Sequence, residues 1–218
     1  MNNVWIVVPI ISNDLDLSDF VEKFTGSYIA PEFYESEVFN RETREIEKNN
    51  ISHPHFRESG PDFSNKIIFV NTKPGYTEYE NIVHLEDFND ISIYRYWNLG
   101  IDYAVANGAE YVVLLNGVIN FDPFIINDSY DEIIKQEKEL VNIFDGAVMI
   151  LSASSSLRPD NQFQIWFGDN DLYRRSESVL GYSRSDYFKL DYLIDHNHDE
   201  SFNAIVKSDE IKYNAKWN

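Results

Sequence analysis

The sequence contains no cysteine, which excludes disulfide bridges, thiolate metal sites and a cysteine nucleophile. It also lacks a long hydrophobic run: the apolar segment 4–11 is far shorter than the roughly 20 residues that span a bilayer. The N-terminal stretch MNNVWIVVPIIS has neither the basic region nor the small-residue cleavage site of a signal peptide. We therefore expect a cytoplasmic protein with no membrane span.

Glycine and basic residues are also sparse. The 9 glycines form no glycine-rich phosphate loop of either common type, and no serine nucleophile elbow is present. The 18 basic residues are outnumbered by 37 acidic ones, and the formal net charge is −19. A field of that sign repels phosphate backbones and anionic lipids, so nucleic acid and membrane surfaces are poor partners. A local nucleotide site is still compatible with this charge where basic groups and backbone amides converge.

What is present is a globular composition, with 43% hydrophobic and 15% aromatic residues. We interpret residues 1–218 as a single domain. Apolar runs predict five strands, at 4–11, 66–72, 81–85, 110–116 and 146–153, of which the first two are expected to be buried. Helical spacing of apolar residues predicts helices over 93–105 and 128–143, and Trp217 is expected to dock the tail on the body. Residues 27–65 show little periodicity and are interpreted as an irregular insertion with at most one short helix.

Strands that alternate with helices predict the fold class. The pattern is typical of a three-layer α/β protein with a mixed, mainly parallel sheet and helices on both faces. In such sheets, ligands bind at the carboxyl ends of the strands. Polar residues at those ends include Asn71 and Asn116, with Asp122 a few residues further on. Fold logic alone names no reaction.

Three stretches carry a resemblance to a known family: VWIVVPIIS, KIIFVNT and RYWNLGIDYAVANGAEYVVLLN. In this order they resemble the nucleotide-sugar-dependent glycosyltransferases of the GT-A (Rossmann-like) fold, in the family 2-like inverting group. The resemblance covers about residues 4–12 and 66–205 and leaves the insertion unmatched. It implies a donor site formed by Pro9, Asn71, Arg95, Asn98, Asn116 and Val118.

The stretch FQIWFGDNDLYRR, residues 163–175, resembles the acidic motif of that family. The resemblance implies that Asp169 is the general base and Asp171 its companion. It also implies that Trp166 and Phe167 exclude water or stack on an acceptor sugar. An inverting transfer needs a carboxylate to accept the proton of the attacking hydroxyl. The alternative is that the two aspartates only cap the following helix, with the two arginines paired to acids.

One departure from the family concerns the metal. The family carries an aspartate at the end of its fourth strand that helps to hold Mn²⁺ or Mg²⁺ against the donor diphosphate, and this sequence reads Asn116-Gly117-Val118 there. The side chain of valine has no oxygen to offer a hard cation, so a divalent metal cofactor is in doubt. Asp122 is a possible substitute, although an aspartate before proline is more typical of a turn.

The segment LIDHNHDES supplies the other candidate metal ligands. The family often places a metal-binding histidine in such a segment, and His198 is our first choice with His196 as the second. The alternative is a solvated histidine pair in an acidic loop. Without a metal, arginines would have to neutralise the departing diphosphate.

The resulting prediction is a transferase that moves a sugar from a nucleotide donor, UDP-linked by resemblance, to a hydroxyl of a sugar or glycosylated protein with inversion. The first alternative is a GT-A binding module that has lost turnover; Val118 favours it and Asp169 speaks against it. The second alternative is a nucleotidyltransferase. That group generally uses a glycine-rich loop with a basic residue near the N-terminus, and none is found here.

Overall fold

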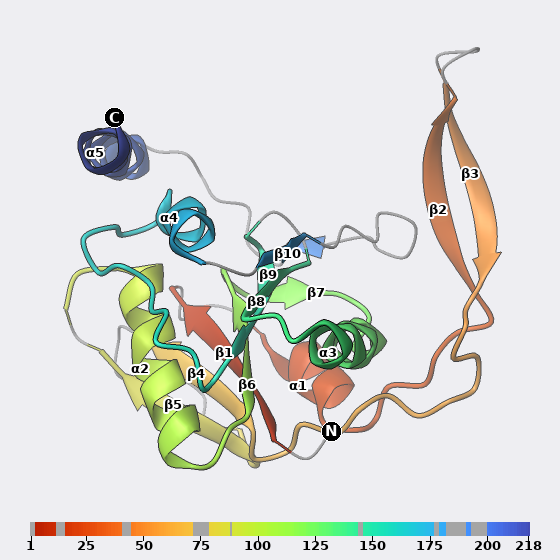
Figure 1. The fold of residues 1–218 in the computed structure, drawn as a ribbon. Coiled ribbons are helices and arrows are strands. Elements are labelled where there is room, and N and C mark those ends of the chain that lie inside the picture. The colour runs from red at the N-terminus through yellow and green to blue at the C-terminus, as the bar shows by residue number, and fades with distance from the viewer. Residues whose placement is uncertain are drawn as a thin grey trace.

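The computed structural model describes residues 3–11, 16–40, 45–71, 79–87, 89–143, 146–176, 179–181, 191–192 and 200–218. At its centre lies a seven-stranded sheet with the order β10-β8-β9-β6-β1-β4-β5 (Figure 1). The strands are β1 (Val4–Ile10), β4 (Ile67–Asn71), β5 (Ile82–Glu86), β6 (Tyr111–Leu115), β8 (Leu140–Asn142), β9 (Val148–Ser152) and β10 (Val179–Gly181). Only β9 runs antiparallel to its neighbours, β6 and β8. The predicted mixed, mainly parallel sheet is confirmed.

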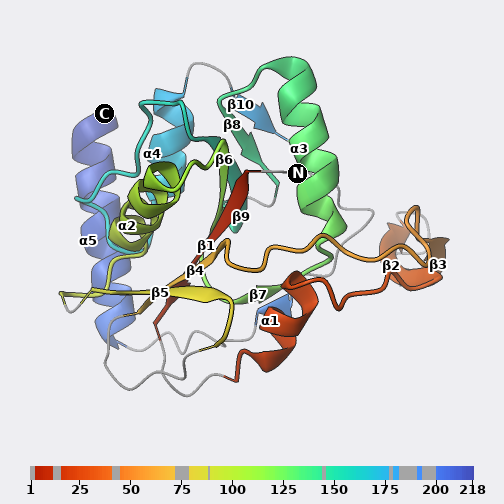
Figure 2. The ribbon, with the colours of Figure 1, turned by 90° about the horizontal axis from the view of Figure 1, so that it is seen from below.

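Helices cover both faces of the sheet, as Figures 1 and 2 show. Helices α1 (Ser18–Phe24) and α3 (Phe124–Gln136) lie on one face, and α2 (Ile93–Ala106) lies on the other. Because successive strand residues point to opposite faces, Ile6 and Val8 join the core with α1 and α3, whereas Val7 joins the core with α2. The predicted three-layer α/β architecture is therefore confirmed.

Helix α2 is fixed against the sheet at two positions. A Cβ atom on Gly100 would collide with the side chain of Val7, so the helix lies in close backbone contact with β1. The indole Nε1 of Trp97 donates a hydrogen bond of 2.6 Å to the carbonyl of Leu115 at the end of β6. The first turn is capped by Ser92, whose Oγ accepts from the backbone N–H of Arg95. These contacts set where the amino end of α2 meets the carboxyl ends of the strands.

The prediction of an irregular insertion at 27–65 was wrong for 33–40 and 45–52. This segment contains an antiparallel hairpin, β2 (Phe33–Asn40) paired with β3 (Glu45–Ser52), which stands apart from the main sheet in Figures 1 and 2. The sequence of β2, FYESEVFN, places its apolar residues in adjacent pairs and not in alternation with polar ones. The period-2 pattern that identifies a half-buried strand is therefore absent, and pairing with β3 decides the structure.

The prediction of one helix over 128–143 was also wrong in its extent. Helix α3 begins at Phe124 and ends at Gln136, and Glu137 follows with a φ of 51°. Leu140–Asn142 then form β8, which pairs with β9. Short apolar runs fit helix and strand alike, and here the sheet pairing decided.

The rest of the described chain adds two helices and a small sheet. Helix α4 (Gly168–Arg175) follows the loop after β9, and α5 (Glu200–Trp217) closes the chain. Strands β7 (Ile119–Asn120) and β11 (Asp191–Tyr192) pair antiparallel. None of the helices in the described ranges is both long enough and apolar enough to cross a membrane.

Candidate active site

The candidate site lies at the edge of the sheet where the parallel strands end. Strands β1, β4 and β6 end there at Ile10, Asn71 and Leu115. Because β9 is antiparallel to β6, its first residues lie at the same edge, and Asn116 N donates a hydrogen bond of 3.1 Å to the carbonyl of Ala147. The turn that leads into β9 therefore lies next to Asn116.

Asp169, the predicted base, is brought to this same turn. A Cβ atom on Gly146 would lie 2.9 Å from Cγ of Asp169 and would collide with its Oδ2. Gly146 has a φ of 86°, and its N–H donates to Oδ1 of Asn142. Asp169 lies in the first turn of α4, where the helix dipole favours a negative charge. The half-buried carboxylate of Asp169 thus lies near the carboxyl edge of the sheet.

The turn before α4 is held from one side by α5. Asp209 is fully buried, and its Oδ2 accepts hydrogen bonds from the backbone N–H groups of Gln164, Ile165 and Trp166 at 2.9, 2.9 and 3.1 Å. Its Oδ1 faces Nζ of Lys212 at 3.0 Å. A buried carboxylate with these partners is well satisfied, so Asp209 fixes the backbone that precedes Asp169.

The same turn is held from the other side by the start of α2. Ile93 N donates to the carbonyl of Gln164 at 2.8 Å, and the hydroxyl of Tyr94 donates to the carbonyl of Ile165 at 2.9 Å. The ring of Tyr94 fills the place that a Cβ on Gly168 would need. Burial, together with the negative charge of Asp169 nearby, raises the pKa of Tyr94 well above its usual value. The hydroxyl therefore stays protonated and remains a donor.

Asp171, the predicted companion of Asp169, is part of the protein interior. It is 0% exposed. Its Oδ2 accepts from Nε of Arg175 at 2.7 Å, and its Oδ1 accepts from Nε1 of Trp217 at 3.0 Å and from Nζ of Lys216 at 2.7 Å. Residues two apart on a helix do not share a face, so the two carboxylates point apart. We assign Asp171 to the joint between α4 and α5.

Trp166 and Phe167, the two aromatic residues of the motif, differ in how accessible they are to a ligand. The side chain of Trp166 is 45% exposed and available to a ligand. Phe167 has a φ of 65° and stacks on Tyr213 of α5, with ring centroids 5.1 Å apart. Of the two predicted acceptor contacts, Trp166 has the more accessible surface.

Several predicted donor contacts do lie at the carboxyl edge. Pro9 is buried in β1 opposite Val70, and Asn71 ends β4 with 4% of its surface exposed. Asn116 has a buried Oδ1 with no hydrogen-bond partner among the described residues. Val118 is 1% exposed and packs in the core on the α1 and α3 side. The valine therefore faces the core and not a ligand.

Arg95 and Asn98, in contrast, are engaged with neighbouring segments. The guanidinium of Arg95 pairs with Asp87 and also donates to the carbonyl of Asp90. Burial tends to raise the pKa of Asp87, but the hydrogen bonds from Arg95 and Asn89 outweigh it and the net shift is downward. The Nδ2 of Asn98 donates to the carbonyl of Pro159 at 2.8 Å. In this structure both side chains anchor α2 to its surroundings.

The described residues do not by themselves fit a divalent metal. The side chain of Val118 offers no oxygen, and no group of three or more His, Asp or Glu side chains suited to a metal occurs in the described ranges. Asp122 accepts from the backbone N–H of Phe124 at 2.9 Å, which is the contact expected of a turn residue. Its Oδ2 also accepts from the hydroxyl of Tyr28 at 2.8 Å and faces Nε2 of His53 at 2.5 Å. His196 and His198 lie outside the described residues. No step of the chemistry below is therefore routed through a metal.

The sequence alone did not single out three residues that shape this site: Gly146, Tyr94 and Asp209. The one signal for Gly146 in the sequence is that it is a glycine ahead of an apolar run, since glycine readily adopts the positive φ found at this turn. Tyr94 falls on the apolar face of α2, and Asp209 is one acid among many. Their contacts are long-range in sequence, so no local pattern marks them.

Comparison with known proteins identifies the fold. No family model matches the sequence, and a search of curated proteins finds no match. Among solved structures, that of S. aureus TarS 1–349 in complex with UDP-GlcNAc superposes with a TM-score of 0.56 at 8% identity, over 96% of this chain and 66% of that one. A second structure of S. aureus TarS 1–349 gives a TM-score of 0.42 at 10% identity, over 57% of this chain and 50% of that one. This chain thus spans between half and two thirds of TarS 1–349, and its fold is that of a GT-A-like glycosyltransferase.

Proposed function

We propose that this protein is a nucleotide-sugar-dependent glycosyltransferase that acts with inversion and uses Asp169 as its general base. The observation that carries the proposal is the position of the Asp169 carboxylate, which lies against Gly146 at the carboxyl edge of the sheet. Ligands of open α/β sheets bind at this edge. Exposed Trp166 lies close by in sequence and offers an aromatic face to an acceptor sugar.

The reaction is a single displacement. The acceptor hydroxyl oxygen attacks the anomeric carbon of the donor while the bond from that carbon to the phosphate oxygen breaks. The hydroxyl proton passes to the carboxylate of Asp169, and the bonding electrons leave with the nucleoside diphosphate. A positioned base of this kind contributes about 10²–10⁴-fold to the rate.

A UDP-linked sugar is the donor that we favour. The support is the likeness to TarS, whose structure was solved with UDP-GlcNAc. Asn71 ends β4 and Asn116 directly follows β6, the two strands that flank β1. The buried Oδ1 of Asn116 lacks a partner among the described residues. An amide with unused hydrogen-bonding capacity suits the ribose hydroxyls or the uracil N–H of such a donor.

The test combines calorimetry and a transfer assay. UDP is titrated into the purified protein with Mn²⁺ and with chelator, and UDP release from UDP-GlcNAc is measured with and without oligosaccharide acceptors. Asp169→Asn should lower turnover by about 10²–10⁴-fold and leave UDP affinity within a few-fold. The control, Asp102→Asn, removes an exposed carboxylate on α2 and should change neither quantity.

Three outcomes would count against this function. Failure to bind UDP under either condition would oppose the nucleotide site as a whole. UDP binding without turnover of any tested sugar donor would favour the binding-module alternative. Loss of UDP binding together with activity in Asp169→Asn would remove Asp169 from the role of base and place it in the donor pocket.

A further inference from the structure

A polar cavity lies at the opposite end of β6 from the candidate active site. Strand β6 begins at Tyr111, and the antiparallel β9 ends opposite it at Ser152. The cavity has a volume of about 480 Å³, and a second cavity of about 460 Å³ shares Tyr111, Ser152 and Ser154 with it. At about 3.3 Å per residue, the strand separates Tyr111 from Asn116 by roughly 17 Å. The cavity is therefore distinct from the carboxyl edge.

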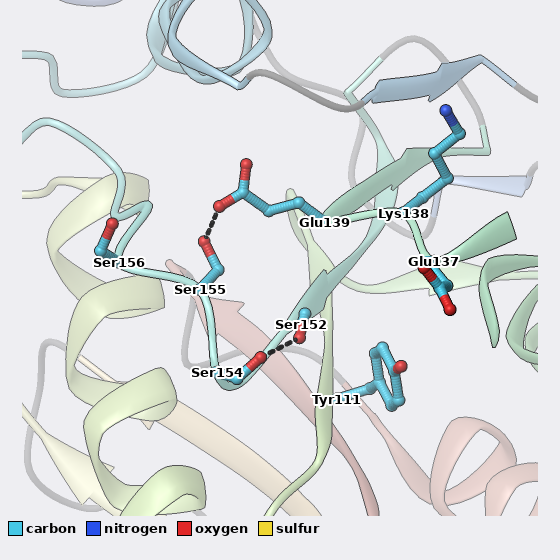
Figure 3. A pocket seen from close by; sticks show the side chains of 8 residues that line it. All are labelled: Tyr111, Glu137, Lys138, Glu139, Ser152, Ser154, Ser155 and Ser156. Atoms are coloured by element: carbon cyan, nitrogen blue, oxygen red, sulfur yellow. Dashed lines mark hydrogen bonds between the residues drawn. The ribbon is translucent and has the colours of Figure 1, made fainter.

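Hydroxyl and carboxylate oxygens dominate the lining, as Figure 3 shows. The carboxylate of Glu139 accepts hydrogen bonds from Ser155 Oγ and from Ser176 Oγ. The hydroxyls of Ser152 and Ser154 bond to each other at 2.9 Å. A hydroxyl offers one donor and two acceptor positions, so Ser152, Ser154 and Ser155 can each take a further partner. The polar groups are thus held in place before any ligand arrives.

An aromatic side chain completes the lining. Tyr111 is half-buried, and its ring stands edge-to-face with Tyr130 at 5.2 Å and 88°. Burial, followed by the charges of Glu110 and neighbouring groups, raises the pKa of Tyr130, so its hydroxyl stays neutral. A fixed tyrosine ring presents an apolar face at low entropic cost together with a polar tip.

The charge of the lining selects the class of ligand. Glu137 and Glu139 line the first cavity, and Glu110 lines the second. Among the described residues that line the two cavities, the one basic side chain is that of Lys138, whose ammonium group points away from the serine side chains in Figure 3. Carboxylates in a protein of net charge −19 disfavour phosphates and other anions. They accept readily from the hydroxyl groups of a neutral ligand.

We propose that this cavity binds a neutral saccharide unit. The apolar face of the sugar ring packs on Tyr111, and its hydroxyls bond to Glu139 and to the serines of 152–155. The cavity volume of about 480 Å³ fits such a ligand, because small-molecule sites occupy about 300–1,000 Å³. The proposal concerns a second site and does not depend on the reaction assigned to Asp169.

The experiment measures saccharide binding by saturation-transfer NMR and by titration. The probes are N,N′-diacetylchitobiose, cellobiose, maltose and lactose, each at high millimolar concentration. The variant Ser154→Trp fills the cavity from an exposed position without removing a core contact. The wild type should bind at least one probe, and the variant should bind it about tenfold or more weakly. The matched control, Ser27→Trp, places the same bulk on exposed surface outside the cavity and should bind as the wild type does.

The outcomes separate this proposal from the function proposed above. Absence of binding to all four probes would overturn it, as would binding that Ser154→Trp leaves unchanged. Displacement of the saccharide by UDP would also overturn it, because the sugar would then occupy the nucleotide edge. Unchanged saccharide binding in Asp169→Asn would support it, whatever the activity of that variant.

Discussion

The backbone of Gly146 and the carboxylate of Asp169 share a space that leaves no room for a Cβ atom. A Cβ at position 146 would lie 2.9 Å from Cγ of Asp169 and closer still to Oδ2. The contact joins the turn before β9 to the first turn of α4. The placement of the proposed base therefore depends on a glycine that lies 23 positions earlier in the printed sequence.

Gly146→Ala should displace Asp169 and lower turnover. The substitution also incurs the cost of a positive φ, which is about 1 kcal/mol. Gly108→Ala is the matched control, since Gly108 has nearly the same φ, 85° against 86°, but no atom within 4 Å of its Cβ position. Transfer assays and denaturant unfolding of both variants separate strain from displacement. Equal activity in the two variants would contradict the role of this contact.

Asp171→Ala should destabilise the protein far more than Asp169→Ala. Asp171 is buried between Arg175, Lys216 and Trp217, and its loss removes the acceptor of Arg175 Nε and Trp217 Nε1 and one of the two carboxylates that Lys216 contacts. Breaking a buried charge pair costs about 3–5 kcal/mol. Urea unfolding of both variants measures the difference. Similar losses of stability would mean that Asp169 is as structural as its neighbour.

Asp209→Ala should lower both stability and activity. The change removes the acceptor for three backbone N–H groups at residues 164–166. Hydrogen bonds to charged groups contribute about 1.5–3 kcal/mol each, so the total loss should be several kcal/mol. Asp209→Asn retains one oxygen and should restore part of both properties.

The control for this prediction is Glu210→Ala, which removes the adjacent exposed carboxylate of α5 and should leave both properties near wild type. Activity that survives intact in Asp209→Ala at a temperature where it remains folded would show that the turn holds Asp169 without α5. Urea unfolding and the transfer assay, run on the same preparations, decide the matter.

The stability that the contact between α4 and α5 gives to the protein should depend on pH. Burial tends to lower the pKa of Lys216, but hydrogen bonds to Asp160 and Asp171 outweigh it and raise that pKa. Burial tends to raise the pKa of Asp160, but the hydrogen bond from Lys216 outweighs it and lowers that pKa. The ion pair therefore stabilises the folded protein at pH values between the lowered pKa of Asp160 and the raised pKa of Lys216. It is lost as pH falls through the lowered pKa of Asp160 and as pH rises through the raised pKa of Lys216.

The measurement compares the wild type with Lys216→Met by urea unfolding at about pH 3, 7 and 11. The wild type should be the more stable protein at the middle value, and the difference should shrink at both extremes. A difference that stays constant over the whole range would show that the methylene chain of Lys216, and not its charge, stabilises the joint.

The local hydrophobic pattern of the sequence was sufficient to predict many of the strands and helices that form the core. The continuous apolar runs of β1, β4 and β6 predict strands of a mainly parallel sheet, the first two of them buried, and the helical spacing of Ile93, Trp97 and Ile101 predicts α2. A strand that is buried on both faces is hydrophobic at nearly every position, so its sequence is easy to identify. Where the signal was mixed, as at Leu140–Asn142, only pairing with β9 decided between helix and strand.

In the acidic motif, the local sequence pattern does not predict which aspartate has which role. The sequence by itself indicated that Asp169 and Asp171 lie at the start of a helix that follows two aromatic residues. Only the tertiary structure decided which aspartate lies at the sheet edge and which is buried. The helix turns residues two apart in different directions, and α5 then covers one of them while Gly146 meets the other. Contacts between segments far apart in the chain make that choice, and no local spacing encodes them.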